Sequence, residues 1–429
     1  GIYRCKWAVL EEAIIDNIRA SASAIIILLL IGAIAGSWMV SGVVPTMIYY
    51  GLKILHPSFF LVASCAICAG VSLMTGSSWT TIATIGVALM GIGQAMGFPE
   101  GWIAGAIISG AYFGDKISLL SDTTVLASST VGVPIFTHIR YMLYTTVPSF
   151  VIALAVFVIA GLTLDHTGGT HAGMYAESLR GTFRITPWLL AVPVATGVLI
   201  VRKLPAIVTL FCAAVFACIA MLLAQPELVA KVAGVGGLDF MSGFKGVLMS
   251  CFGPTAIPTG SPQLDELVAT RGMAGMLNTV WLIICAMCFG GVMTGSGMLG
   301  ALTSVFLRFV RRAFSAVAST VGAGIFFNLC TADQYISIIL SGRLFRELYA
   351  EQGLEPRLLS RSVEDSATVC SVLVPWNSCG MTQATVLGVS TFVYMPYCIF
   401  NIVSPLMSLA VAAIGWKIKR AAGSAAHPH

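Results

Sequence analysis

Acidic side chains within otherwise apolar stretches are the residues of this sequence best able to do chemistry. They are Asp115, Asp122, Asp333, Glu364 and Asp365. A carboxylate at the centre of a bilayer costs about 2.5–3.5 kcal/mol on insertion scales, so each one implies a partner or a bound ion. Most of them fall at breaks rich in Gly, Ser and Thr, and hydroxyl and amide side chains accompany them there: Ser78, Thr80, Ser121, Thr123, Asn328, Thr331, Thr368 and Asn377. Oxygen ligands without a His or Cys cluster suit a hard cation, and the set indicates Na⁺.

The same carboxylates predict competition between Na⁺ and protons. Burial disfavours the ionised form of a carboxyl group and a nearby cation favours it, so one group can hold either a proton or Na⁺. Lys116 follows Asp115 directly and is the expected charge partner when no ion is bound. Structural alternatives stay open. Asp115 and Lys116 can form an ion pair at a helix end, and Glu364 can be a solvated helix start. The hydroxyl groups can form hydrogen bonds between packed helices.

The elements that position these residues follow from composition. The chain of 429 residues is 57% hydrophobic and 10% charged, whereas soluble domains carry about 25% charged residues. We therefore expect an all-α, multi-pass membrane protein whose main partner is lipid. With 23 basic and 18 acidic residues, the chain lacks the dense positive face that nucleic-acid binding needs. A crossing takes about 20 apolar residues, and the plain candidate spans are 141–162, 187–201, 205–224 and 395–416.

Three further apolar stretches are interrupted by polar and small residues. They are 22–55, 58–97 and 101–134, and the interruptions contain Gly, Ser, Thr and Asp. Irregular backbone at membrane depth is tolerated only where it is buried in protein or lines water. These stretches therefore predict discontinuous or re-entrant helices around a cavity.

Comparison of the sequence with itself indicates an internal repeat. Ser41 and Gly42 recur as Ser296 and Gly297 at an offset of 255, and Trp79 aligns with Tyr335 at an offset of 256. Several matches at nearly one offset, in one order, predict two copies of one unit. The expected organisation is repeat 1 at 1–140, a three-helix linker at 141–260, repeat 2 at 261–394, and a C-terminal helix with a cytoplasmic tail at 395–429.

Loop charges predict that the two repeats are inverted. Short basic loops mark the cytoplasmic side, and here they are 4–19, 202–203, 308–312 and 417–420. On this basis repeat 1 starts inside and repeat 2 starts outside. Inverted repeats of secondary transporters place their site near the membrane midplane, where broken helices meet.

Several ordered strings resemble one known family. They are Thr75-Gly-Ser-Ser-Trp-Thr80, Gly110-Ala-Tyr-Phe-Gly-Asp-Lys116, Ser121-Asp-Thr-Thr124, Asp333-Gln-Tyr-Ile-Ser337, Glu364-Asp-Ser-Ala-Thr368 and Val374-Pro-Trp-Asn377. The strings are similar to those of the NhaC family of Na⁺/H⁺ antiporters, and the resemblance covers nearly the whole chain. It implies a multi-pass antiporter of the bacterial inner membrane, in a group that includes malate–lactate exchangers coupled to Na⁺ and H⁺. Leu119 and Val372 stand where members usually have Pro, a change expected to ease the backbone toward helix at both breaks.

The leading functional hypothesis is exchange of Na⁺ for H⁺ by alternating access, without a cofactor. Exchange of a small carboxylate such as malate or lactate is the alternative, with Lys116 as the main cation for the anion. An intramembrane aspartyl protease is a weaker alternative, because Gly114-Asp115 matches only part of the G-x-G-D signature and position 112 is Tyr. No enzymatic role is expected, and a homodimer is an assembly that the sequence allows.

Overall fold

The computed structural model describes residues 5–164, 170–202, 204–237, 239–259, 265, 268–299, 301, 306, 312–416 and 418. Its longer helices are α1 (Trp7–Val40), α2 (Val43–Ile54), α3 (Phe60–Thr75), α5 (Val87–Ala95), α6 (Glu100–Ile117), α7 (Asp122–Val131), α8 (Ile135–Thr163), α9 (Thr170–Thr182), α10 (Ala191–Val201), α11 (Ala206–Ala224), α12 (Pro226–Ala233), α13 (Phe240–Phe252), α15 (Gly272–Gly295), α17 (Ala313–Thr331), α18 (Gln334–Glu351), α19 (Pro356–Val363), α20 (Ser378–Leu387) and α22 (Ile399–Ile414). Shorter pieces are α4 (Ser78–Thr81), α21 (Thr391–Tyr394), the π-helices η2 (Ile82–Gly86) and η4 (Glu364–Thr368), and the 3₁₀ turns η1 (Pro57–Phe59), η3 (Pro187–Leu190), η5 (Ser371–Leu373) and η6 (Met395–Tyr397). The described residues form no β-strand.

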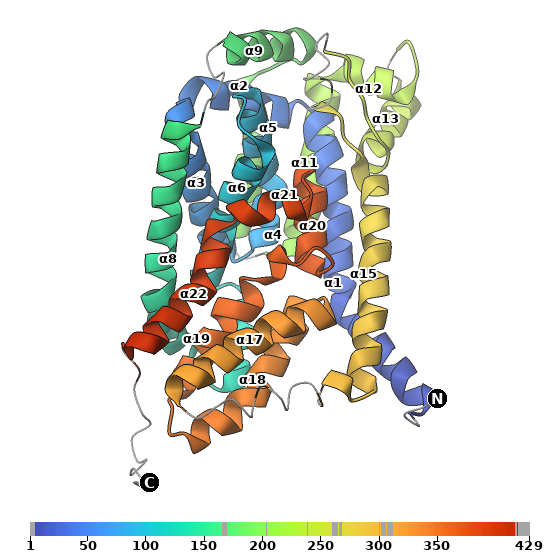
Figure 1. Ribbon diagram of the computed structural model, residues 1–429. Helices are drawn as coiled ribbons and strands as arrows, with labels where there is room; N and C mark the ends of the chain where they lie inside the picture. Colours follow the sequence, from blue (N-terminus) through green and yellow to red (C-terminus); the bar gives the residue numbers. More distant parts are fainter. Residues whose placement is uncertain are drawn as a thin grey trace.

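The helices have the length and composition of a multi-pass membrane protein (Figure 1). Within the described residues, six helices are long and apolar enough to cross a membrane, and three bent helix pairs raise the number to nine. The predicted all-α class, with discontinuous helices, is therefore confirmed. Of the predicted spans, 141–162 lies within α8 and 205–224 matches α11, whereas 187–201 is a short segment bent by 95° against α9. The basic segment 308–311 and the tail 419–429 lie outside the described residues.

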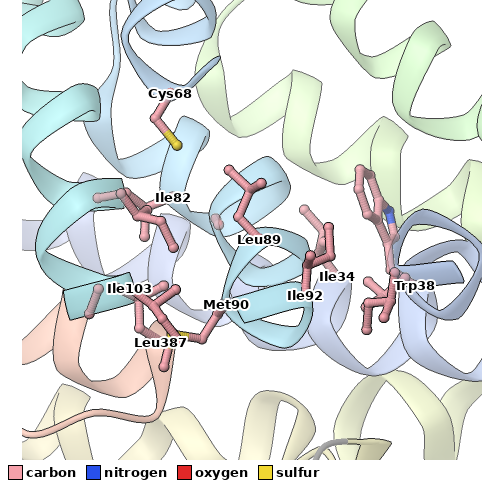
Figure 2. Packing of buried hydrophobic residues seen from close by; sticks show 14 of the residues in the cluster. Ile34, Trp38, Cys68, Ile82, Leu89, Met90, Ile92, Ile103 and Leu387 are labelled. Atoms are coloured by element: carbon pink, nitrogen blue, oxygen red, sulfur yellow. The ribbon is translucent and has the colours of Figure 1, made fainter. Parts of the chain in front are cut away.

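The apolar core joins helices from distant parts of the chain. Ile34 and Trp38 of α1 lie beside Leu89 and Ile92 of α5, as Figure 2 shows, and Leu387 of α20 reaches the same cluster. Because lipid is as apolar as these side chains, close packing rather than exclusion from water holds such helices together. The core fixes α5, and with it the break that precedes α4.

Small residues on α6 allow unusually close helix contacts. A Cβ added to Gly110 or Gly114 would come within 2.0 or 2.2 Å of a backbone oxygen of α3, at Cys65 and Ala69. The spacing of four residues puts both glycines on one face of α6, the arrangement of small-xxx-small contacts in membranes. This contact anchors the end of α6 that carries Asp115.

The first and last residues of several helices recur along the chain at one spacing. Both bounds of α20 lie 256 positions after those of α7, and α18 begins and ends 256 positions after the α4–η2–α5 segment. α1 and α15 pack side by side in opposite directions: Gly32 lies against Gly272, and Gly291 lies against Ile14. Figure 1 shows the same antiparallel pair, with α1 running away from the N-terminal end and α15 running back.

Candidate functional site

The first helix break delivers two hydrogen-bond donors to a buried carboxylate. α3 ends at Gly76, whose φ of +66° suits a residue without a side chain, and Ser77 caps α4 by accepting from the Thr80 amide at 3.2 Å. The next residue, Ser78, donates to Asp115 Oδ2 from its amide at 3.1 Å and from its hydroxyl at 2.7 Å. Asp115 is thus fixed at the end of α6 by the start of α4.

The second helix break holds a carboxylate of its own. Asp333 caps α18, and its Oδ1 accepts from the amides of Tyr335 and Ile336 at 2.8 and 3.1 Å. The hydroxyl of Ser378 donates to Asp333 Oδ2 at 3.2 Å. The positive end of the helix dipole favours a negative charge at this cap. Before it, Ala332 adopts φ +57°, which is uncommon for a residue other than Gly.

Both breaks open onto one cavity of about 700 Å³. Among its walls are Asp115, Asp122 and Asp333, together with Thr80 and Thr123. Asp115 and Asp333 are buried, whereas Asp122, at the start of α7, is exposed. α1 and the connection between α10 and α11 complete the wall. The cavity therefore brings together carboxyl groups from segments more than 200 residues apart.

Lys116 pairs with Asp365 rather than with its neighbour Asp115. Its ammonium donates to Asp365 Oδ1 and, at 2.9 Å, to the hydroxyl of Ser404, and both members of the ion pair are fully buried. Successive helical residues point to different faces, which explains why Asp115 turns to Ser78 and Lys116 to η4. The expectation that Lys116 is the partner of Asp115 is therefore wrong for this structure.

Glu364 connects the ion pair with the cavity. Its Oε1 accepts from the hydroxyl of Thr123 at 3.3 Å, and Thr123 lies in the cavity wall and contacts Ser121 at 3.0 Å. Glu364 is fully buried, so the alternative of a solvated helix start is excluded. It is adjacent to Asp365 in η4, and π-helical turns are frequent at functional sites.

Three other predicted ligands hold the second break together, and neither they nor a fourth, Thr368, line the cavity. Asn377 caps α20 and donates to Asn328 at 3.2 Å, and Asn328 donates to the Ala367 carbonyl at 2.7 Å. Thr331 donates to the Asp333 carbonyl, and Thr368 is buried in η4. The break at residues 118–121 persists with Leu119 in place of Pro, whereas Val372 lies in the 3₁₀ turn η5.

Three residues of the buried charge cluster are absent from the predicted ligand set. Thr145 donates to Asp365 Oδ1 at 3.2 Å, Ser404 lies 3.3 Å from the same oxygen, and Arg361 Nε lies 3.9 Å from Oδ2. Arg361 is fully buried. In the sequence, Arg361 precedes Asp365 by four residues, a spacing that puts both on one helix face and could have indicated their pairing. Thr145 lies in an ordinary apolar span and carries no such signal.

The spans, the two broken helices and the carboxylate-lined cavity define a multi-pass membrane protein of the ion-transporter class. A family model described as the Na⁺/H⁺ antiporter family matches residues 110–416. The chain belongs to that family, whose members are transporters rather than enzymes.

Curated relatives that match most of this chain are named as antiporters. The Na⁺/H⁺ antiporter NhaC of Alkalihalophilus pseudofirmus is 35% identical over 96% of this chain and 86% of its own. The malate-2H⁺/Na⁺-lactate antiporter of Bacillus subtilis is 36% identical over 95% of this chain and 83% of its own. The YdaH transporter of Alcanivorax borkumensis, a solved structure, aligns with 94% of this chain and 88% of its own at a TM-score of 0.41 and 13% identity.

Proposed function

We propose that this chain exchanges Na⁺ for H⁺ across the bacterial inner membrane by alternating access, with both ions competing for buried carboxylates. One observation carries the proposal: Asp115 and Asp122 from one half of the chain and Asp333 from the other line a single cavity. Family membership supports Na⁺ and H⁺ as the transported ions, and the lining of the cavity supports these carboxylates as the residues that bind them.

We infer that the two halves are inverted repeats around this cavity. The recurrence of helix bounds at 256 positions supports the repeat, and the antiparallel packing of α1 and α15 supports the inversion. The same spacing relates the start of α8 to the start of α21, so we assign α8 to the first repeat and α21–α22 to the second. The linker then consists of α9 to α13 and is shorter than 141–260.

The competition rests on how the carboxylates are already bonded. Both donors of Ser78 reach Oδ2 of Asp115, and we assign Oδ1 to the cargo. The hydroxyl of Ser121 interacts with the same carboxylate, and Thr123 lies 3.0 Å from Ser121. A protonated carboxyl group offers Na⁺ no charge, and a bound Na⁺ favours loss of the proton. Each turn of the site between the two faces would therefore carry one kind of ion in each direction.

An imposed Na⁺ gradient across proteoliposomes tests this proposal. A pH dye should report proton movement against Na⁺, and Asp115→Asn should abolish it. Asp16→Asn is the matched control, because Asp16 is exposed on α1, where it pairs with Arg19. Exchange that survives in Asp115→Asn at the rate of the control would remove Asp115 from the site.

Coupled exchange of a small carboxylate is the second candidate. Two fully buried cations, Lys116 and Arg361, favour it, because an anionic substrate needs buried positive charge, and one relative is named for malate and lactate. Malate or lactate added to one side should then accelerate Na⁺ flux in the same vesicles. An unchanged flux would leave Na⁺ and H⁺ as the cargo.

A further inference from the structure

Asp365 lies between two polar stripes, on α8 and α22. On α8, His138, Thr145 and Ser149 recur at helical spacing, and on α22 Ser404 and Ser408 are one turn apart. Residues at such spacing share a helix face. The contacts of Thr145 and Ser404 with Asp365 show that both faces point toward this carboxylate. All five residues of the stripes are buried.

Each stripe has one member on the same side of Asp365, toward one end of the molecule. The rings of Phe150 and Phe400 are 6.3 Å apart and those of Tyr144 and Trp416 are 5.3 Å apart, so α8 and α22 run antiparallel. Ser408, later on α22, and His138, earlier on α8, therefore lie on the same side of Asp365. That side is the end where α8 begins, as in Figure 1.

Buried polar atoms along this seam lack hydrogen-bond partners within the described part of the chain. They are all three guanidinium nitrogens of Arg361, Nε2 of His138, Oγ of Ser408 and Oδ2 of Asp365. Arg361 Nε is 3.9 Å from Asp365 Oδ2, which is too far for a hydrogen bond. Buried polar groups are almost always bonded, and buried water is the usual partner when protein supplies none. Four such groups in one seam indicate a file of water molecules.

The seam reaches the surface near the start of α8. His138 is in the first turn, and its Nδ1 is 2.8 Å from the hydroxyl of Ser360 on α19. Two residues later Arg140 is exposed. Arg357, which is 27% exposed, and Arg361 both lie over the ring of Tyr141, at 4.9 and 4.8 Å. Neither His138 nor Arg361 lines the 700 Å³ cavity.

We propose that water molecules between α8, α19 and α22 carry protons between Asp365 and His138, on a route separate from the cavity that admits Na⁺. A proton on the His138 imidazolium passes from Nε2 along the waters to the Asp365 carboxylate, which is ionised in its pair with Lys116. In the reverse direction the protonated carboxyl returns the proton to Nε2, and the imidazolium releases its Nδ1 proton toward Ser360 and the surface. Lys116 of α6 and Asp365 of η4 are the charges that act on this imidazole. Glu364, bonded to Thr123, joins the two routes. This inference rests on the proposed exchange function.

Measurements of two transport modes can distinguish a proton route from an ion route. Exchange of radioactive Na⁺ for unlabelled Na⁺ requires the cavity but no net proton transfer, whereas Na⁺/H⁺ exchange requires both. His138→Asn keeps an amide near Ser360 but cannot carry a proton, and Ser408→Val fills the seam with methyl groups. His56→Asn is the matched control, because His56 is an exposed cap of η1 that accepts from the Ser58 amide at 3.3 Å.

His138→Asn and Ser408→Val should each slow Na⁺/H⁺ exchange about tenfold or more. Na⁺/Na⁺ exchange should stay within about twofold of wild type. The two modes would then differ by roughly 1 kcal/mol or more in the change of their barriers. A monodisperse elution profile checks that each variant is folded. If His138→Asn is not folded, the result for Ser408→Val decides the test. Equal slowing of both modes, or no slowing of either, would overturn the proton route. Wild-type protein that moves no Na⁺ would instead overturn the proposed function itself.

Discussion

The two helix breaks at the cavity share one hydrogen-bond framework but differ in charge. In the first, the Thr75 hydroxyl donates to the Ser77 carbonyl at 3.1 Å, and in the second the Thr331 hydroxyl donates to the Asp333 carbonyl at 3.2 Å. The residue between them has positive φ in both breaks, and the next residue caps a helix. The backbone is therefore held alike on both sides, whereas the cap is neutral in one and acidic in the other.

The charge that the first cap lacks is supplied by another element. Asp115, at the end of α6, lies beside the first break, and its counterpart 256 positions later is Ser371, which donates to Gln334 at 3.4 Å. Each half thus contributes a carboxylate, but from a different position in the repeated unit. The proposed repetition accounts for the shared scaffold, and the unequal placement of acids gives two carboxylates with different bonding.

Breaking the link between the halves should have the largest effect. Lys116→Met takes from the buried Asp365 the closer of its two cationic neighbours and leaves Arg361 Nε at 3.9 Å, and loss of one member of a buried pair costs about 3–5 kcal/mol. We expect a much lower unfolding temperature by intrinsic fluorescence in detergent.

The double variant Lys116→Met with Asp365→Asn removes both charges of the pair and should recover part of that stability. The recovery stays partial because the buried Arg361 then loses its neighbouring carboxylate. Lys53→Met is the control, because Lys53 contacts Tyr49 on an exposed face of α2. A Lys116→Met protein as stable as this control would show that the pair is not what joins the halves.

Making the second break resemble the first should affect transport more than folding. Asp333→Ser keeps a good helix cap, since Ser and Asp cap about equally well, but removes the carboxylate. We expect Na⁺/H⁺ exchange in proteoliposomes to fall about a hundredfold, roughly 2.7 kcal/mol in barrier, with the unfolding temperature nearly unchanged. Retained exchange would mean that Asp115 suffices and that the asymmetry of the breaks has no role in transport.

The fold class could be read from the sequence, whereas the partners of the charges could not. Apolar stretches interrupted by Gly, Ser and Asp predict broken membrane helices, because irregular backbone at membrane depth is tolerated where it is buried in protein or lines water. Lys116 and Asp365 are 249 positions apart, and no local pattern says that α6 ends against η4. Asn328 and Asn377 show the opposite error, in which the sequence predicts a role that the contacts do not support. Their side-chain amides were expected to bind the ion but hydrogen-bond to the backbone and to each other.

The smallest expected effect comes from the residue of positive φ in each break. A Cβ on Gly76 would lie 2.6 Å from the backbone of Leu120, so Gly76→Ala adds a clash to the strain of φ +66°. Ala332 already tolerates φ +57° with its Cβ in place, and Ala332→Gly relieves about 1 kcal/mol of strain but increases the entropy of the unfolded chain. Thermal unfolding should therefore show a clear loss for Gly76→Ala and a shift below about 1 kcal/mol for Ala332→Gly. Equal and opposite shifts would mean that the two breaks are equivalent in packing as well as in backbone, because the contact with Leu120 would then cost nothing.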